Sequence, residues 1–232
     1  MPIAGNRRVS SRYSNPGFDI KDPSLVLYLP LYYPDSETTG SPIISKDINR
    51  HSCTVTGTTW GSQGRTLDGD DYIELTSSAM DFTTSPFTIC AWVKTTNLTA
   101  HNSILCRGLT NTDGYYFDIY SGGLLRLRTS QAGVNQESNS DSGTILTNVN
   151  YFVSAVRSGS SVRIYRNGID ITNAVGTHIN PVTSARTVKL GVYDDKAYAP
   201  LKGTMGEVLV YSRALSDSEI RQRYQVTKWR YM

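Results

Sequence analysis

The sequence predicts an all-β protein: an antiparallel β-sandwich jelly roll with one short C-terminal helix. Serine and threonine account for 26 and 25 of the 232 residues and are joined by many Val, Ile and Tyr, a composition that favours strands and turns. Short alternating segments are separated by glycine turns, and long runs with helical apolar spacing are absent. Many short strands at this density are typical of a sandwich or jelly roll.

Residues 115–120 and 124–129 predict the first hairpin. In YYFDIY and LLRLRT, alternate side chains are apolar, so each strand would turn one apolar face to the core. Gly122-Gly123 between the two segments supplies the tight turn of a hairpin.

A three-stranded meander is predicted next, from residues 151–157, 161–166 and 169–172. Ser158-Gly159-Ser160 separates the first two segments, and Asn167-Gly168, the dipeptide most compatible with two positive φ angles, separates the last two. Further strands are expected at residues 187–193 and 206–212.

One helix is predicted near the C-terminus, in RALSDSEIRQRY (213–224). Ser216 can cap the amide of Glu219 while the Glu219 side chain reaches back, and Leu215 can pack on Ile220. Together these features form a capping box with a hydrophobic staple, which is a structural signal.

The chain is expected to form one domain, residues 25–225, between two basic ends. Residues 1–24 lack periodicity and are rich in Pro and Gly, so they predict a flexible arm; residues 226–232 predict a basic tail. Arg7, Arg8 and Arg12 are the candidate docking residues of the arm, which would order against a protein partner or a capsid or tail lattice.

Net charge is +3, and the two ends (residues 1–24 and 220–232) carry +2 and +4, which leaves −3 for the body between them. A body of that sign offers no footprint for nucleic acid, and no apolar run is long enough to insert into a membrane. The three cysteines lack metal or redox spacing and are expected to be small buried hydrophobes. With no secretory signal at the N-terminus, we expect assembly in a cytosol.

Five groups of residues follow one another in a recognisable order: LDGDDYIEL (67–75), FTICAWVK (87–94), SILCRG (103–108), YFVSAVR with VRIYRNG (151–168), and LKGTMGEVLVYSRALSDSEIRQRY (201–224). This order resembles the LamG-like (laminin G-like), concanavalin A-like lectin and glucanase jelly-roll family over about residues 25–225. The resemblance implies the jelly-roll fold, and Trp92 on the A-W-V strand is expected in the core.

Hydrolysis must be tested because the family includes glycoside hydrolases, which need two suitably spaced carboxylic acids. The hydrolase branch carries an E-x-D-x-E strand, and none of the five glutamates here lies in such a pattern. The histidines are isolated and expected on surfaces or loops, and no G-x-S-x-G elbow occurs. The sequence therefore predicts no catalytic residue and disfavours an enzyme.

Calcium is the one cofactor that the sequence suggests. Asp68, Asp70 and Asp71 lie within four residues, and the resemblance implies that Glu207, before the last strand, could approach the same edge. Ca²⁺ accepts six to eight oxygen ligands, although Asp-Gly-Asp-Asp is also an ordinary turn.

A ligand rim is expected on loops, which carry variation on a rigid sandwich. The loop 193–201 combines flat aromatic faces with acceptors, the mixture that sugars favour, in Tyr193, Asp194, Asp195 and Tyr198. The polar segment 129–143 is a second candidate. Both segments could equally be solvated connections, and that interpretation is favoured for 129–143.

Two functions remain open. One is a virion-associated structural or decoration protein that docks through its terminal segments and is exposed on a virion surface. The other is a carbohydrate-binding, lectin-like adhesion module for cell-surface glycans, in a calcium-dependent or calcium-independent form. The sequence also leaves a homo-oligomer open.

Overall fold

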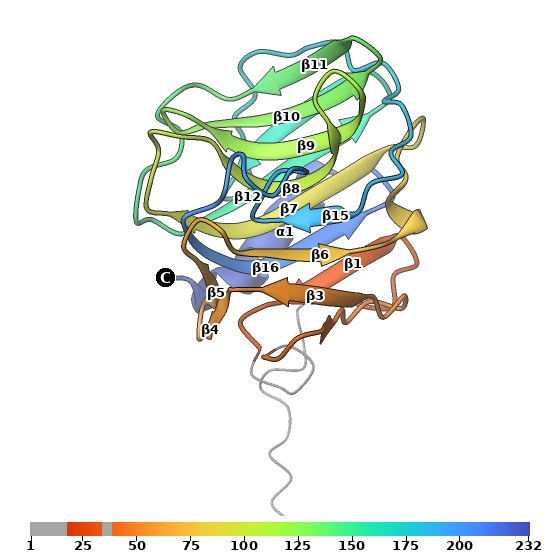
Figure 1. Ribbon diagram of the computed structural model, residues 1–232. Helices are drawn as coiled ribbons and strands as arrows, with labels where there is room; N and C mark the ends of the chain where they lie inside the picture. The colour runs from red at the N-terminus through yellow and green to blue at the C-terminus, as the bar shows by residue number, and fades with distance from the viewer. Residues whose placement is uncertain (1–17, 34–38) are drawn as a thin grey trace, which may run out of the picture.

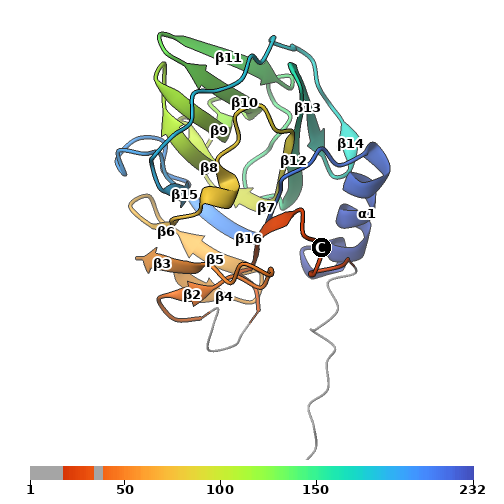
Figure 2. The same ribbon diagram turned by 90° about the vertical axis from the view of Figure 1, so that its right-hand side faces the viewer.

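Two antiparallel sheets stack face to face, with a helix on the outside of one of them (Figures 1 and 2). The computed structural model describes residues 18–33 and 39–232. Within this part, no helix has the length and apolar character needed to cross a membrane. The predicted all-β jelly roll with one C-terminal helix is confirmed.

The sheet beneath the helix, called here the helix sheet, has the strand order β14-β13-β12-β7-β16-β5-β4, with β1 also paired to β16. All its pairs are antiparallel. Its strands are β1 (Leu25–Pro30), β4 (Thr59–Gly61), β5 (Gly64–Leu67), β7 (Phe87–Thr95), β12 (Tyr151–Ser158), β13 (Ser161–Arg166), β14 (Ile169–Asp170) and β16 (Gly203–Tyr211).

The opposite sheet, called here the loop sheet, has the order β11-β10-β9-β8-β15-β6-β3-β2 and is also antiparallel throughout. Three helical elements complete the fold: η1 (Ser78–Met80), α1 (Asp217–Thr227) and η2 (Lys228–Arg230). The strands of the loop sheet are β2 (Ile43–Ile44), β3 (Ser52–Thr56), β6 (Tyr72–Leu75), β8 (Asn102–Leu109), β9 (Asp113–Tyr120), β10 (Leu124–Gln131), β11 (Val134–Asn139) and β15 (Val188–Leu190).

The glycine turns set the hairpins as predicted. Tyr120 pairs with Leu124 across Gly122-Gly123, and Arg166 pairs with Ile169 across Asn167-Gly168. Asn167 and Gly168 have φ angles of 52° and 79°, the two positive values that this hairpin turn requires. The segment 129–143 differs from expectation, because β11 lies within it and pairs with β10. Its polar side chains suit an edge strand as well as a loop.

The main core fills the space between the two sheets, where alternate residues of each strand meet. In β9, for example, Tyr115, Phe117 and Ile119 face this core, while Tyr116 belongs to a separate small cluster on the other side of the strand. Cys53, Cys90 and Cys106 are free and buried, as predicted. One face of the loop sheet therefore packs in the main core, and the other carries a small buried cluster of its own.

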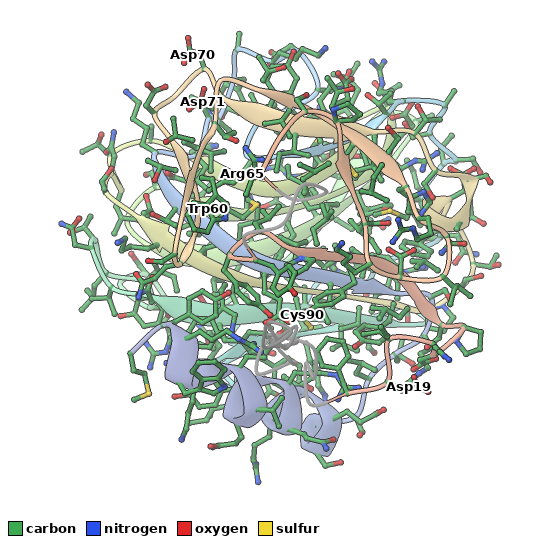
Figure 3. All side chains as sticks on the ribbon, turned by 90° about the horizontal axis from the view of Figure 1, so that it is seen from below. Asp19, Trp60, Arg65, Asp70, Asp71 and Cys90 are labelled. Atoms are coloured by element: carbon green, nitrogen blue, oxygen red, sulfur yellow. The ribbon has the colours of Figure 1, made fainter. Side chains whose placement is uncertain are left out.

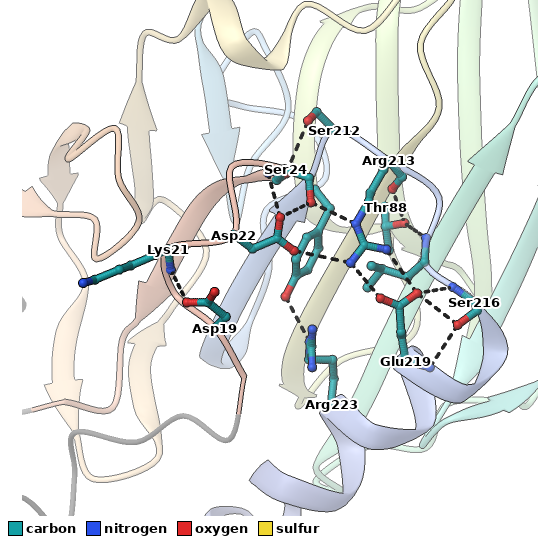
Figure 4. Close-up of polar contacts among 12 residues, drawn as sticks. Asp19, Lys21, Asp22, Ser24, Thr88, Ser212, Arg213, Ser216, Glu219 and Arg223 are labelled. Carbon is teal, nitrogen blue, oxygen red and sulfur yellow. Dashed lines mark hydrogen bonds and ion pairs between the residues drawn. The ribbon is translucent and has the colours of Figure 1, made fainter.

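The helix begins at a capping box, as predicted. The Ser216 side chain accepts from the Glu219 amide, and the Glu219 side chain accepts from the Ser216 amide at 2.9 Å. Arg213 pairs with Glu219 at 2.7 Å, and this hydrogen-bonded guanidinium is the main cause that lowers the pKa of Glu219 to about 2 (Figure 4). Leu215 and Ile220 are buried in one cluster under the helix.

The N-terminal boundary of the folded unit lies earlier than expected. Asp22 binds the guanidinium of Arg213 at 3.3 Å (Figure 4), and Phe18 packs edge-on against Tyr28 with ring centroids 5.2 Å apart. The guanidinium of Arg223 lies 4.8 Å from the Phe18 ring. Residues 18–24, assigned above to a flexible arm, thus pack on the body, while Arg7, Arg8 and Arg12 lie outside the described residues.

The C-terminal residues 226–232 also differ from the expected tail. Tyr231 is buried and stacks on Trp92 with ring centroids 4.3 Å apart. A Cβ at Gly206 would come within 2.5 Å of the Tyr231 ring, so only glycine at that position of β16 lets the ring approach this closely. The C-terminal segment is therefore part of the folded unit.

Candidate ligand-binding site

The loop between β15 and β16 folds back over the outer face of the loop sheet and is tied there by ion pairs. The ammonium of Lys189 on β15 lies 2.8 Å from Asp194 and 3.5 Å from Glu74 on β6. Lys196 pairs with Glu74 at 2.9 Å, and Arg186 also pairs with Asp194. Asp194, predicted as a ligand contact, thus holds the loop to the sheet.

Tyr193 has a similar supporting place. Its ring stacks on Tyr116 of β9, with centroids 4.8 Å apart and planes at 6°, and its hydroxyl bonds Thr110. Burial raises the pKa of Tyr193 and keeps its hydroxyl protonated. Two of the four predicted rim residues therefore lie under the loop and position it.

The other two rim residues face solvent. Asp195 is exposed, and its Oδ1 accepts from the amides of Ala197 and Tyr198 at 3.0 and 2.8 Å, which shapes the loop tip. Tyr198 is 49% exposed and packs edge-on against Tyr193, with centroids 5.4 Å apart. The loop thus presents one rigid aromatic side chain at the surface.

Tyr198 lines an open hollow of about 360 Å³. Three segments meet there: residues 99–101 before β8, Ser121 in the turn after β9, and residues 197–199 of the loop. We call this the rim hollow; its lining residues are Thr99, Ala100, His101, Ser121, Ala197, Tyr198 and Ala199. β15, which leads into the loop, lies on the opposite side of the molecule from α1 (Figure 2).

His101 links the aromatic residues of the rim hollow. Its Nδ1 lies 2.7 Å from the Tyr198 hydroxyl, and its ring lies 4.0 Å from that of Tyr120 between centroids. Burial is the main cause that lowers the pKa of His101, so the ring is neutral at neutral pH. A neutral imidazole can donate from one ring nitrogen and accept at the other.

Sequence reasoning identified Tyr198 but not His101, Tyr120 or Ser121. His101 stands alone in the sequence, and Tyr120 reads only as the last residue of an alternating strand. Their meeting with Tyr198 depends on two loops and a turn that the sheet order brings together. No short-range sequence pattern predicts that these residues meet.

The predicted acidic cluster does form, in the turn between β5 and β6. Oxygen atoms of Asp68, Asp70 and Asp71 lie within 4.8 Å of one another, and Asp70 sits at the edge of the molecule (Figure 3). Asp71 accepts from the Asp68 amide at 3.0 Å, which is also the bond of an ordinary turn. Within the described residues no basic side chain forms an ion pair with these carboxylates.

Calcium binding at these aspartates stays a prediction. If the three carboxylates hold Ca²⁺, a saturating concentration should raise the melting temperature by roughly 5 °C or more, and EDTA should reverse the rise. The variant Asp70→Asn should lose most of this response, while Asp141→Asn, an exposed acid in another turn, should keep it. Unchanged melting in Ca²⁺ and EDTA, with no heat on titration, would leave the cluster as a turn.

Glu207 does not join this cluster, which corrects the sequence expectation. Its side chain lies on the outer face of the helix sheet, fully buried beneath the C-terminal segment, where Arg230 pairs with it at 3.5 Å. The alternation along β16 places Glu207 with Leu209 and Tyr211, which belong to the cluster under α1.

The remaining glutamates of the described residues are likewise held by basic side chains. Glu74 pairs with lysines, Glu137 with Arg128 at 2.7 Å, and Glu219 with Arg213. His178 lies in the loop between β14 and β15, which agrees with the expected surface or loop position, and it is fully buried there between Thr129 and Ser138, at 2.8 and 2.9 Å. Burial lowers the pKa of His178 to about 4.

The fold and the site together define the class of protein. It is a jelly-roll sandwich whose loops form a surface hollow with an exposed aromatic side chain. The family model described as the concanavalin A-like lectin/glucanases superfamily matches residues 67–221, well over half of the chain. The protein belongs to this superfamily. A search of the curated proteins finds no match.

Solved structures with the same fold include toxin binding domains. The binding domain of Paraclostridial Mosquitocidal Protein 1 is 16% identical with a TM-score of 0.67 and covers 89% of this chain. The botulinum neurotoxin serotype D ligand binding domain in complex with N-acetylneuraminic acid is 14% identical with a TM-score of 0.66 and covers 88% of this chain. This chain spans 52% and 51% of those two structures.

Proposed function

We propose that the protein is a non-catalytic carbohydrate-binding module that holds glycans in the rim hollow. The observation that carries the proposal is Tyr198, whose ring is half exposed yet fixed by Tyr193 beneath it and His101 beside it. A surface aromatic side chain that is held rigid loses little conformational entropy when it binds a ligand.

The chemistry of the rim hollow suits a sugar ring. Sugars have an apolar C–H face that packs on aromatic rings and hydroxyl groups that exchange hydrogen bonds with small polar side chains. Tyr198 supplies the aromatic surface, and His101, Ser121 and Thr99 supply donors and acceptors. The open shape favours contact with the end or side of a glycan and weak affinity.

The comparisons with solved structures of low sequence identity support this class of function. The similar structures are described as receptor binding, binding or ligand binding domains, and one holds N-acetylneuraminic acid. The absence of an acid pair from the sequence motifs, and the ion pairs of the described glutamates, support a module without hydrolytic activity.

Replacing Tyr198 with alanine should weaken glycan binding about tenfold or more, because the aromatic contact surface is lost. The measurement is a glycan array, followed by titration calorimetry with the glycans that bind. Tyr198→Phe keeps the ring and loses the bond to His101, so it should bind with intermediate affinity. Trp229→Ala, which removes a 59% exposed aromatic side chain on the helix side, is the matched control.

The proposal fails if the wild-type protein binds no glycan, or if Tyr198→Ala and Trp229→Ala bind equally well. Melting temperatures of all variants should stay close to the wild type, because both side chains are exposed. Release of reducing sugar from polysaccharides would overturn the non-catalytic part of the proposal.

We further propose that the module is carried on a particle surface, such as that of a virion assembled in a cytosol, and attaches through its N-terminal residues. Phe18 and Asp22 clamp the start of the folded unit to the face that bears α1, opposite the loop that carries Tyr198. Attachment there would leave the rim hollow facing outward. Deleting residues 1–17 should abolish particle association and leave glycan binding intact; retained association would contradict it.

A further inference from the structure

We propose that the rim hollow selects uncharged glycans and rejects those that present a carboxylate to it. The inference rests on the proposed function and specifies its ligand class. It is carried by the charges around the hollow: the lining is uncharged, the buried guanidinium of Arg126 beside it is paired with two carboxylates, and the loop tip carries the exposed Asp195.

The lining itself offers no cation within the described residues. Thr99, Ser121 and Tyr198 are neutral polar side chains, and three alanines complete the wall with His101. The lowered pKa of His101 keeps that imidazole neutral at neutral pH. Recognition of a carboxylate normally uses Arg or Lys, because a charged donor must replace the water lost from the anion.

Arg126 lies beside the hollow, next to Tyr120, and its guanidinium is paired with two carboxylates. It lies over the ring of Tyr120 at 4.2 Å from the centroid. Its Nε and one terminal nitrogen donate to Asp118 at 3.1 and 2.7 Å, and the other terminal nitrogen donates to Glu137 at 3.5 Å. The side chains of Arg126 and Asp118 are only 6% and 3% exposed, so this pair is unavailable to an acidic sugar.

The loop tip adds a negative charge and turns its positive charge away. Asp195 is exposed and is bonded to the amides of Ala197 and Tyr198, both in the lining. Lys196, between Asp195 and Ala197, pairs with Glu74 and lies over the ring of Tyr72, away from the hollow. An anionic ligand would therefore meet repulsion from Asp195 without a compensating cation.

The experiment compares glycans that end in a hexose with the same glycans oxidised at C6 to the hexuronic acid, and with the methyl ester of that acid. We expect the acid to bind at least tenfold more weakly than the hexose and the uncharged ester to recover most of the affinity. Glycans ending in N-acetylneuraminic acid should be absent from the bound set. The variant Asp195→Asn keeps the acceptor for both amides and removes the charge, so it should narrow the difference in affinity between the acid and the hexose.

Acid bound as tightly as the hexose would overturn the inference while leaving carbohydrate binding in place. An ester that stays as weak as the acid would also overturn it, because the loss would then come from shape. Binding of no glycan, neutral or acidic, would instead overturn the proposed function and the inference with it.

Discussion

Replacing Trp92 with alanine should lower the free energy of unfolding by about 3–5 kcal/mol, as expected for removal of a fully packed indole. Trp92 is 2% exposed on the outer face of the helix sheet, where it stacks on Tyr231 and contacts Tyr224 of α1 with ring centroids 5.8 Å apart. Its indole N–H donates to the Thr227 hydroxyl at 2.9 Å in a buried position. One side chain thus joins β7 to both α1 and the C-terminal residues.

The measurement is urea unfolding followed by circular dichroism, because two other tryptophans would confuse a fluorescence signal. Trp92→Phe keeps much of the packing and loses the N–H donor together with part of the indole ring, so its destabilisation should be smaller, about 1–2 kcal/mol. Trp60→Ala, at a 39% exposed position, is the control for loss of an indole from the surface. A stability of Trp92→Ala within experimental error of Trp60→Ala would show that the C-terminal segment does not depend on this contact.

The elements that depend on local chemistry were predictable from the sequence. Asn167-Gly168 encodes its turn through two positive φ angles, and Ser216 with Glu219 encodes the helix start through two reciprocal hydrogen bonds. Each signal lies within four residues, so it can be recognised without knowledge of the rest of the fold.

The ends of the folded unit were not predictable in the same way. Phe18 and Tyr231 lie in segments without periodicity, and the partners that bury them, Tyr28 and Trp92, become available only when the helix sheet has formed. A single aromatic residue in a polar segment carries no sign of such a partner. Composition therefore assigned residues 18–24 to an arm and residues 226–232 to a tail, whereas the structure packs both segments onto the body.

The candidate site was likewise predictable only in part. Tyr198 stands out because the loop that carries it is rich in aromatic and acidic residues, but Tyr193 and Asp194 in that loop have structural contacts. Distinguishing exposed from supporting residues requires knowing which of them faces the loop sheet. The alternation rule does not extend into a loop.

Between about pH 4.5 and pH 7, the stability of the protein should fall relative to the variant Glu207→Gln by about 3 kcal/mol as pH rises. Glu207 is fully buried, and burial is the main cause that raises its pKa from 4.5 to about 7. The folded state therefore holds this proton more tightly than the unfolded state. Its contribution to stability is complete below pH 4.5, declines as pH rises toward 7, and is lost above it.

The tyrosines that face Glu207 keep their protons across this window. Burial raises the pKa of Tyr32 to about 12 and those of Tyr28 and Tyr231 well above 10. Carboxylates with lowered pKa values, such as Glu219 at about 2, lose their contribution only at lower pH. Glu207 thus titrates in a different pH range from these tyrosines and from the carboxylates with lowered pKa values.

The measurement is urea unfolding of the wild type, Glu207→Gln and Glu219→Gln at a series of pH values. Subtracting each variant from the wild type removes the titrations that all three share, including those of the histidines. The difference for Glu207→Gln should change with pH as described, and the difference for Glu219→Gln should stay constant, because that carboxylate is ionised in both folded and unfolded protein over most of the window. Parallel curves for wild type and Glu207→Gln would contradict the prediction, because they would mean that the interactions of Glu207 with Arg230, Tyr28 and Arg223 offset the effect of burial on its pKa.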